Sequence, residues 1–326
     1  MRILVTGGAG YIGSVTAAVL LQRGHEVVVL DDLRTGHRAA VPDDVPFVQA
    51  DVADEDAVGD AIDRYRLEAV VHFAANSLVG ESMERPLLYF GNNTAGSLSL
   101  LATALRHGAN RFVLSSTAAL YGTPERVPIR EDDPLAPESV YGESKHLIER
   151  ALPWLARTAG LGWTALRYFN AAGAHGVRGE DHRPETHLIP IVLQVALGQR
   201  ERVHLFGEDY DTDDGTAVRD YVHVADLADA HVRALEAIRP GTGSAYNVGT
   251  GRGYSVREVV ETCREATGAT IPAEPAPRRA GDPPRLVADP TKIERELGWR
   301  PERPALRDIV DSAWAWHRDH PGGYPD

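Results

Sequence analysis

Short apolar runs alternate with longer stretches of helical periodicity through the first half of the chain. The short runs are rich in β-branched residues, which favours buried strands. Between them, apolar residues recur every three or four positions, which predicts helices with one face turned toward a core. Strands are therefore predicted at residues 2–7, 26–31, 46–51, 69–75, 111–116 and 163–170.

This alternation of strands and helices is typical of βαβ units, in which successive strands are parallel. The sequence therefore predicts an α/β protein built on a doubly wound parallel sheet with helices on both faces. Residues 1–170 are assigned to this sheet domain. Residues 171–326 are assigned mainly to a smaller C-terminal α/β substrate domain, with some later segments returning to the sheet domain.

The hydropathy pattern changes after residue 170. Residues 171–186 are predicted to form a loop, and a helix is predicted over residues 187–200. The following segment, 205–224, is acidic and rich in turn-forming residues. Residues 271–285 contain so many prolines that no regular structure is predicted there.

Composition and charge argue against several functional classes. The 326 residues include 34 Lys and Arg against 47 Asp and Glu, a formal net charge of −13 that disfavours nucleic acid as a partner. No segment approaches the roughly 18 apolar residues that suggest a membrane span. The strand pattern begins at the first residues and leaves no room for a secretion signal. A cytoplasmic location is expected, and the single Cys263 fits a reducing compartment.

The thirteen histidines show no spacing typical of a metal site. His182 and His187 lie five residues apart around a proline, and the sequence contains no HxxxH helix motif and no CxxC pair. No metal is therefore expected.

The segment VTGGAGYIGS contains the glycine pattern of a Rossmann dinucleotide site. Gly8, Gly10 and Gly13 have the spacing GxGxxG, and Gly7 begins an overlapping GxxGxxG pattern. These glycines follow a predicted strand and open a predicted helix, so the backbone can turn tightly and approach a pyrophosphate at the helix N-terminus.

The next predicted strand ends at Asp31, about twenty residues after the glycine pattern. A carboxylate there accepts both ribose hydroxyls and repels a 2′-phosphate, so NAD is expected rather than NADP. Arg34 is the one nearby residue that would favour NADP. Asp51 is a candidate adenine contact, and the segment from Phe73 to Ala75 is expected to lie along the cofactor.

The segment VYGESKHLIER places Tyr141 and Lys145 on one face of a predicted helix. A phenol with a pKa near 10 must fall by about 3 units, or roughly 4 kcal/mol, to act as a base near neutral pH. An ammonium about 4 Å away supplies roughly 4 kcal/mol at an effective dielectric of about 20. Tyr141 is therefore the candidate acid and base, and Lys145 is expected to lower its pKa and to hold the nicotinamide ribose.

Three consecutive hydroxyl residues end the strand in RFVLSSTAALYG. Because side chains alternate along a strand, Ser115 and Thr117 should face one side and Ser116 the other. Thr117 lies at the carboxyl end, where α/β sheets bind ligands, so it is best placed to reach a substrate oxygen. Ser115 and Ser116 are expected to bond to backbone. Tyr121 is not expected to be the catalytic tyrosine.

These motifs, with HFAANSLVGES, LRYFNAAGAH, VRDYVHVADLADAH, APRRAGD and HPGGYPD, resemble the UDP-glucose 4-epimerases of the extended short-chain dehydrogenase/reductase family. The resemblance runs from Met1 to Asp326. It implies tightly bound NAD, a UDP-sugar substrate, and interconversion of UDP-galactose and UDP-glucose through a transient 4-keto sugar. It also implies a homodimer formed through the helices that follow Asn92 and Tyr141.

The resemblance assigns the role of base to Tyr141, of its partner to Lys145, and of the hydroxyl that binds the sugar O4 to Thr117. Asn76 and Ser77 stand where many relatives have a lysine that touches the cofactor, so weaker NAD retention is expected. The expected cofactor-binding residues are Gly7, Gly10, Tyr11, Ile12, Gly13, Asp31, Asp32, Asp51, Val52, Phe73, Ala74, Ala75, Asn92, Ser115, Tyr141, Lys145 and Tyr168. The expected substrate-binding residues are Thr117, Tyr141, Phe169, Asn170, His187, Leu188, His204, Phe206, Arg219, Tyr221, Arg279, Asp282 and Leu286.

Sugar specificity is a separate question. Leu286 falls where a tyrosine in relatives excludes N-acetyl sugars, so some turnover of UDP-N-acetylhexosamines is expected. A dTDP-sugar, a pentose or a uronic acid remains an alternative substrate.

Three other functions share the expected fold. Dehydratase relatives have an Asp-Glu pair after the threonine, where this chain has Ala118 and Ala119, so elimination would lack its acid and base. Non-catalytic NAD-sensing proteins have usually lost the tyrosine and lysine that this chain retains. A plain dehydrogenase would accumulate NADH, whereas an epimerase would not.

Overall fold

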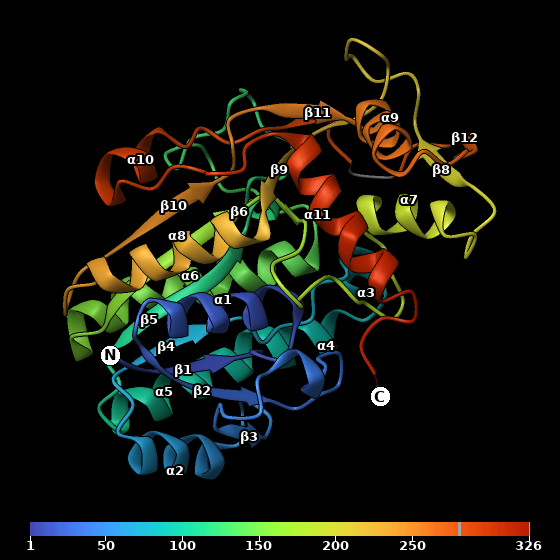
Figure 1. The fold of residues 1–326 in the computed structure, drawn as a ribbon. Helices are drawn as coiled ribbons and strands as arrows, with labels where there is room; N and C mark the ends of the chain where they lie inside the picture. The colour runs from blue at the N-terminus through green and yellow to red at the C-terminus, as the bar shows by residue number, and fades with distance from the viewer. Residues whose placement is uncertain (280–281, 326) are drawn as a thin grey trace.

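Seven parallel strands form the central sheet of the computed structural model, which describes residues 1–279 and 282–325. The strand order is β10-β6-β5-β4-β1-β2-β3 (Figure 1). The chain starts in the middle of the sheet, and the order reverses beside β1, which leaves a ligand-binding crevice at the carboxyl ends. The strands are β1 (Arg2–Thr6), β2 (Glu26–Asp31), β3 (Phe47–Gln49), β4 (Ala69–His72), β5 (Arg111–Thr117), β6 (Gly162–Tyr168) and β10 (Gly243–Val248).

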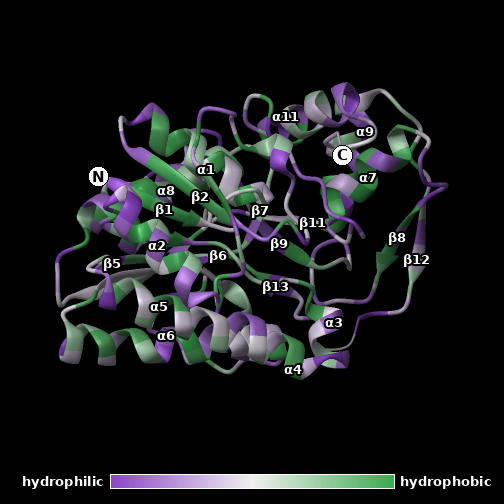
Figure 2. Ribbon diagram, turned by 90° about the horizontal axis from the view of Figure 1, so that it is seen from below, coloured by the Kyte–Doolittle hydropathy of each residue, from purple (hydrophilic) through white to green (hydrophobic). Residues whose placement is uncertain are grey.

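Helices cover both faces of this sheet, which confirms the predicted doubly wound fold. α1 (Tyr11–Gln22) and α8 (Val224–Ala237) share one apolar core with the sheet. α2 (Glu55–Tyr65), α5 (Gly96–Arg106) and α6 (Val140–Ala159) share the other. Figure 2 shows α5 and α6 side by side below the largely apolar strands. Because both faces are covered, every residue of β4 is buried, and the strand has no polar alternation.

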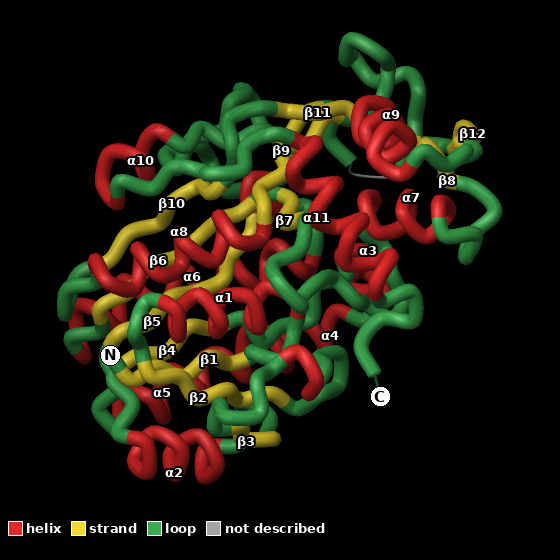
Figure 3. The backbone as a smooth tube through the Cα atoms, viewed as in Figure 1, coloured by secondary structure: helices red, strands yellow, loops and turns green. Residues whose placement is uncertain are grey.

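A second group of elements packs beside the carboxyl ends of the sheet. α7 (Leu188–Ala196), α9 (Val256–Thr267) and α11 (Leu306–Asp319) share an apolar core and lie together in Figure 3. β11 (Gly253–Ser255), β9 (Val218–His223) and β13 (Arg285–Leu286) form a small sheet, which β7 (Asn170–Ala172) joins through β9. The remaining elements are η1 (Arg38–Ala40), α3 (Val79–Glu84), α4 (Pro86–Tyr89), a π-helical turn η2 (Phe90–Ala95), η3 (Ala118–Tyr121) and α10 (Thr291–Leu297).

The chain crosses between the two groups several times. α8 and β10 lie late in the sequence, yet they belong to the large sheet and its covering layer. Within residues 1–279 and 282–325, no helix has the combination of length and apolarity that a bilayer crossing requires.

The proline-rich segment contains a strand, so the prediction of no regular structure over residues 271–285 was wrong. β12 (Ala273–Ala276) pairs in parallel with β8 (Val203–Phe206) in a two-stranded sheet. The carbonyls of Pro272 and Ala276 accept hydrogen bonds from the β8 side, so Pro275, at an odd position between them, faces away from the ladder. A proline is tolerated on such an edge because its missing N–H is not needed.

The turn from β1 into α1 depends on glycine at two positions. Gly7 has a φ of +69°, in the left-handed region that favours glycine. A Cβ on Gly13 would lie 2.1 Å from the carbonyl oxygen of Gly7. The helix can therefore pack onto the turn only without a side chain at this position.

We expect Gly13→Ala to lower the free energy of unfolding by about 1–3 kcal/mol, the usual range for overpacking. The matched control is Gly80→Ala in α3, where a new Cβ meets nothing within 4 Å. That variant should be neutral or gain up to about 1 kcal/mol from helix propensity. Urea denaturation of the two variants checks the pair, and equal stabilities would contradict the packing explanation.

Candidate active site

The glycine turn presents the N-terminus of α1 to the crevice beside β1. No side chain caps this helix, whose first residue is Tyr11, so its first amides are available to an anion. The Tyr11 hydroxyl donates a 2.6 Å hydrogen bond to the carbonyl of Gly173, and the Ile12 side chain packs against the core. The sequence-predicted pyrophosphate turn therefore has the geometry that an anion site requires.

Asp31 is fixed at the carboxyl end of β2, beside the glycine turn. Its carboxylate is buried and accepts hydrogen bonds from the amides of Ala9 and Leu33, both at 2.9 Å. Burial raises the pKa of Asp31, and these two amide bonds oppose the shift. Each carboxylate oxygen has a second lone pair that can accept a ribose hydroxyl.

Arg34 lies among acceptors at the same edge. It forms an ion pair with Asp32, and its guanidinium donates to Asp51 at 3.0 Å and to the side chain of Asn92 at 2.9 Å. Its positive charge is therefore largely compensated by this chain's own carboxylates. This arrangement favours the interpretation that Asp31 selects a ribose without a 2′-phosphate.

The wall of the crevice comes from the ends of β3 and β4. Val52 is buried beneath it, and the Phe73 ring packs 4.7 Å from the His231 ring. Ala74 approaches the glycine turn so closely that a Cβ on Gly7 would lie 2.5 Å from its amide nitrogen. Ala75 follows with a partly buried side chain.

Asn93 is a supporting residue that the sequence did not single out. Its buried side chain accepts the Asn76 amide at 2.8 Å and donates to the Asn76 carbonyl and to Ser144, both at 3.0 Å. It therefore joins the segment after β4 to α6, while Asn92 faces Arg34. The only sequence signal was the doubled asparagine, which does not show which of the two side chains is buried.

The three hydroxyls at the end of β5 are all buried. Ser115 lies 2.8 Å from the Tyr168 hydroxyl, and Ser116 donates to the carboxylate of Glu149. The expectation that these two serines bond to backbone was therefore wrong, because buried side chains from β6 and α6 lie within reach. Thr117 accepts the Ala119 amide at 3.1 Å.

Tyr141 and Lys145 lie in the first two turns of α6, against this end of β5. The Lys145 ammonium is buried and donates a 3.0 Å hydrogen bond to the Ser115 carbonyl. Burial lowers the pKa of Lys145 to about 8, although the nearby Glu149 carboxylate opposes the shift. Burial raises the pKa of Tyr141 well above its ordinary value, although a hydrogen bond from Thr117 opposes this shift.

The sequence analysis expected Lys145 to lower the pKa of Tyr141. In this structure burial raises that pKa instead. The expectation counted on the charge of the Lys145 ammonium, which in the structure donates to the Ser115 carbonyl. Desolvation of the phenolate is therefore the dominant effect.

A buried ion pair lies below this centre. Arg167 donates to both carboxylate oxygens of Glu149, at 3.1 and 2.6 Å, and both side chains are almost fully buried. Arg167 also donates at 2.9 Å to the Tyr121 hydroxyl, which in turn donates to Asn247 at 2.7 Å. Burial raises the pKa of Tyr121 to about 12. Tyr121 therefore serves this network and is not positioned as a base, as expected.

The smaller group of elements contributes arginines near the same crevice. Arg219 on β9 forms an ion pair with Asp282 and is mostly buried. The Arg279 guanidinium lies 4.1 Å from the centre of the Phe206 ring, which is 37% exposed. These residues add two permanent positive charges to the smaller group of elements.

The other candidate substrate residues divide between this crevice and the core. Phe169 and Leu286 pack on the cluster formed by Ala118, Tyr121 and Ile129, directly after Thr117. Asn170 pairs in register with Tyr221, which is buried in the core and is a poor ligand contact. Leu188 begins α7, His187 lies in a loop cluster of glutamates and histidines, and His204 is exposed on β8.

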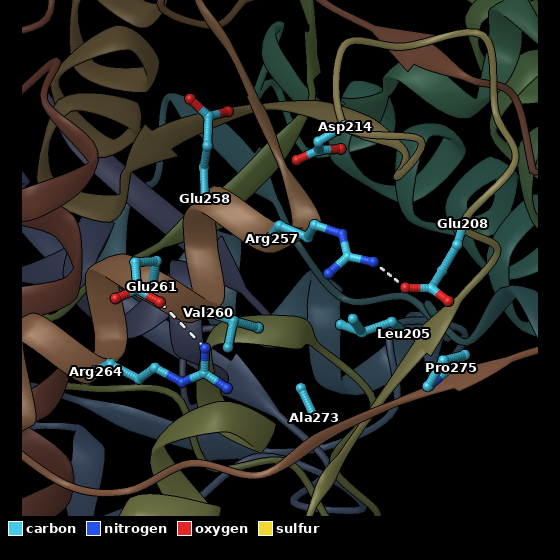
Figure 4. Close-up of a pocket in the computed structure, with 10 residues that line it drawn as sticks. All are labelled: Leu205, Glu208, Asp214, Arg257, Glu258, Val260, Glu261, Arg264, Ala273 and Pro275. Carbon is cyan, nitrogen blue, oxygen red and sulfur yellow. Dashed lines mark hydrogen bonds and ion pairs between the residues drawn. The ribbon is translucent and has the colours of Figure 1, made fainter.

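A separate hollow lies between α9 and the β8–β12 sheet (Figure 4). Arg257 on α9 pairs with Glu208 across it, and Arg264 pairs with Glu261 one turn away on the same helix. It contains none of the candidate site residues, and both of its arginines are already paired with carboxylates.

Comparisons with known proteins agree with this arrangement. Residues 3–249 match the model of the NAD dependent epimerase/dehydratase family. A UDP-glucose 4-epimerase of Halalkalibacterium halodurans is 52% identical over 99% of this chain and 98% of its own length. A crystal structure of a UDP-glucose 4-epimerase has a TM-score of 0.96 and 47% identity, with 100% of both chains covered. The Bifidobacterium longum UDP-glucose 4-epimerase, in complex with NAD+ and UDP, has a TM-score of 0.94 and 37% identity, covering 99% of this chain and 100% of its own.

The buried ion pair yields a stability prediction. We expect Arg167→Met to lower the free energy of unfolding by about 3–5 kcal/mol, because it leaves the buried Glu149 carboxylate without its partner. The milder control, Tyr121→Phe, should lower it by about 1 kcal/mol, since it removes only hydrogen bonds. Chemical denaturation compares the two, and an Arg167→Met variant as stable as Tyr121→Phe would contradict the assignment.

Proposed function

Because the chain belongs to the NAD dependent epimerase/dehydratase family, we propose that it interconverts UDP-galactose and UDP-glucose by inversion at the sugar C4 with bound NAD. One observation carries this proposal: Tyr141, Lys145 and Thr117 converge at the carboxyl end of β5. The alanines after Thr117 leave no carboxylate there for elimination. The enzyme is an isomerase, since hydride leaves and returns to the same sugar.

The residues present fit NAD. The uncapped N-terminus of α1 suits the pyrophosphate, and Asp31 suits the adenine ribose. The carboxylates that compensate Arg34 disfavour a 2′-phosphate at the same place. NAD supplies a hydride acceptor and donor when it is bound.

The chain's own residues move the proton. Tyr141 takes the proton of the 4-hydroxyl as hydride leaves C4, which produces a 4-keto sugar, and Thr117 donates a hydrogen bond to O4. Lys145 holds positive charge beside the phenolate and so offsets part of its burial. After the sugar turns over, hydride returns to the opposite face of C4 and Tyr141 returns the proton to O4, so no net redox change occurs.

Two arginines are proposed to hold the diphosphate while the sugar turns. Arg219 and Arg279 are permanently charged bidentate donors that suit phosphate oxygens. Asp282 is already paired with Arg219 and orients its guanidinium. Phe206, which lies beneath Arg279, offers an aromatic surface to the nucleotide. Asn170 and Leu188 are proposed to contact the uridine and sugar.

A homodimer through α5 and α6 is proposed as well. Large apolar side chains are exposed on and near these helices: Leu98 on α5 is 40% exposed, and Trp154 on α6 is 65% exposed. Exposed apolar patches of this kind mark association surfaces.

The cytoplasm is the proposed location, because the enzyme's one cysteine is a buried free thiol and its close relatives are bacterial enzymes.

An NMR time course with UDP-galactose and no added NAD tests the reaction. We expect UDP-glucose to appear until equilibrium, with no NADH accumulating in proportion to product. Accumulation of NADH with an oxidised sugar, or no conversion by NAD-loaded enzyme, would contradict epimerisation.

We expect Tyr141→Phe to lower kcat by about 10³-fold or more, in the upper range for loss of a general acid-base group. Thr117→Val, nearly isosteric, should lower kcat by about 10²-fold. The matched control is Tyr121→Phe, which removes a buried hydroxyl outside the crevice and should retain turnover. Coupled spectrophotometric assays on variants with confirmed NAD content measure all three. Retention of more than a few per cent of kcat in Tyr141→Phe would remove Tyr141 as the base.

Sugar breadth depends on Leu286, which packs beside Phe169 next to Thr117. The wild type should turn over UDP-N-acetylgalactosamine, and Leu286→Tyr should lower kcat/KM for it by about 10–200-fold, the range for a pocket misfit. Turnover of UDP-galactose by the same variant should stay close to wild type. No N-acetyl activity in the wild type would contradict a gate set by side-chain size.

A further inference from the structure

A cluster of two carboxylates and two imidazoles lies in the loop between β7 and α7. Glu180, His182, Glu185 and His187 each offer one ligand atom, and these four atoms all lie within 4.8 Å of one another. The expectation of no metal rested on helical and paired-cysteine spacings. Neither spacing describes a loop that brings residues 180, 182, 185 and 187 together.

The four side chains lie at ion-pair distances, with His187 Nδ1 hydrogen-bonded to Glu185 Oε1, and zinc binding would move three of these atom pairs apart by about 0.3–0.6 Å. His187 Nδ1 lies 2.9 Å from Glu180 Oε1 and 3.0 Å from Glu185 Oε1. His182 Nδ1 lies 3.2 Å from Glu180 Oε1 and 3.9 Å from Glu185 Oε2. Tetrahedral ligands with bonds of about 2.0–2.2 Å to zinc lie roughly 3.5 Å from one another.

His182 Nδ1 provides an independent observation. This nitrogen is enclosed by the protein and makes no hydrogen bond, although Glu180 Oε1 is only 3.2 Å away. Buried polar atoms nearly always have a hydrogen-bond partner. His182 Nδ1 therefore lies close to the Glu180 carboxylate without forming a hydrogen bond to it. A nitrogen in this position is free to bind a metal ion.

Charge balance favours a divalent ion at this place. Glu180 is 4% exposed and Glu185 8% exposed, so two carboxylates are withdrawn from water. Buried carboxylates are costly unless they are paired or coordinate a metal. A divalent cation with two neutral imidazoles compensates both charges, and a set of two nitrogens and two oxygens suits zinc.

Neighbouring groups hold the ligands in place. Glu185 Oε1 accepts the amides of Thr186 at 2.7 Å and His187 at 2.8 Å, which fixes its carboxylate. Asp181 accepts the Tyr324 amide at 2.9 Å and so ties the loop to the end of the chain. The His187 side chain is 45% exposed, which gives an ion a path to the cluster.

We propose that Glu180, His182, Glu185 and His187 bind one zinc ion. All four positions are filled by protein ligands, so the ion is structural and has no open position for substrate. It fixes the loop that leads from β7 into α7. His187 is then a zinc ligand in place of the substrate contact expected from the sequence.

The test uses the full-length enzyme with its bound NAD. We expect about one zinc per chain by mass spectrometry of protein grown with zinc. X-ray absorption should show nitrogen and oxygen ligands at about 2.0–2.1 Å and no sulfur. After chelator treatment, calorimetric titration with ZnCl2 should restore one site per chain.

His182→Gln should weaken zinc binding by at least about 100-fold, since even supporting residues alter metal affinity 10–100-fold. The control is His107→Gln, which removes another histidine beside a carboxylate, Asp63, 3.0 Å away. If His182→Gln does not fold, Glu180→Gln replaces it, with folding checked by circular dichroism. Equal zinc affinity in wild type and variant, or a wild type that binds no zinc, would overturn the proposal and leave protonated imidazoles as the counter-charges.

Discussion

The packing of α6 against the carboxyl end of β5 is the constraint on which the site depends. The ammonium of Lys145 is buried and donates a hydrogen bond to the Ser115 carbonyl. One turn further along the same face, Glu149 meets Ser116 and the buried guanidinium of Arg167. Two strands and one helix are therefore joined by charges that water cannot screen. A shift of α6 would break all of these contacts together.

The remaining parts of the site are arranged around this contact. The reversal of strand order beside β1 opens the crevice, and the glycine turn lets the backbone approach it. Asp31 and the carboxylates around Arg34 define one end. The smaller group of elements supplies cations at the other end.

Local signals were sufficient for much of this architecture. Six of the seven strands of the large sheet, the glycine turn and the i, i+4 relation of Tyr141 and Lys145 follow from short-range patterns, whereas β10 was not among the predicted strands. The partner of Ser116 could not be foreseen, because Glu149 is 33 residues away and meets it only through the fold. The strand at Pro275 depends on an edge position that periodicity does not reveal.

Electrostatics were the least predictable from the sequence. A helix face brings a tyrosine and a lysine together, but only the packing decides where the ammonium donates and how deeply the phenol is buried. The pKa of Tyr141 was expected to fall, and burial raises it in this structure. The Glu/His cluster likewise depends on the path of a loop, which has no periodic signal.

The central claim is that Tyr141 is the base and that the positive charge of Lys145 offsets part of the rise in pKa that burial imposes on its phenol. NMR titration of 13C-labelled tyrosine, assigned by Tyr141→Phe, measures this pKa in NAD-loaded wild type and in Lys145→Met. The Tyr141 pKa should be lower in the wild type than in Lys145→Met by about 1 unit or more, because a nearby ammonium stabilises the phenolate. The same Tyr141 pKa in both proteins would contradict the claim.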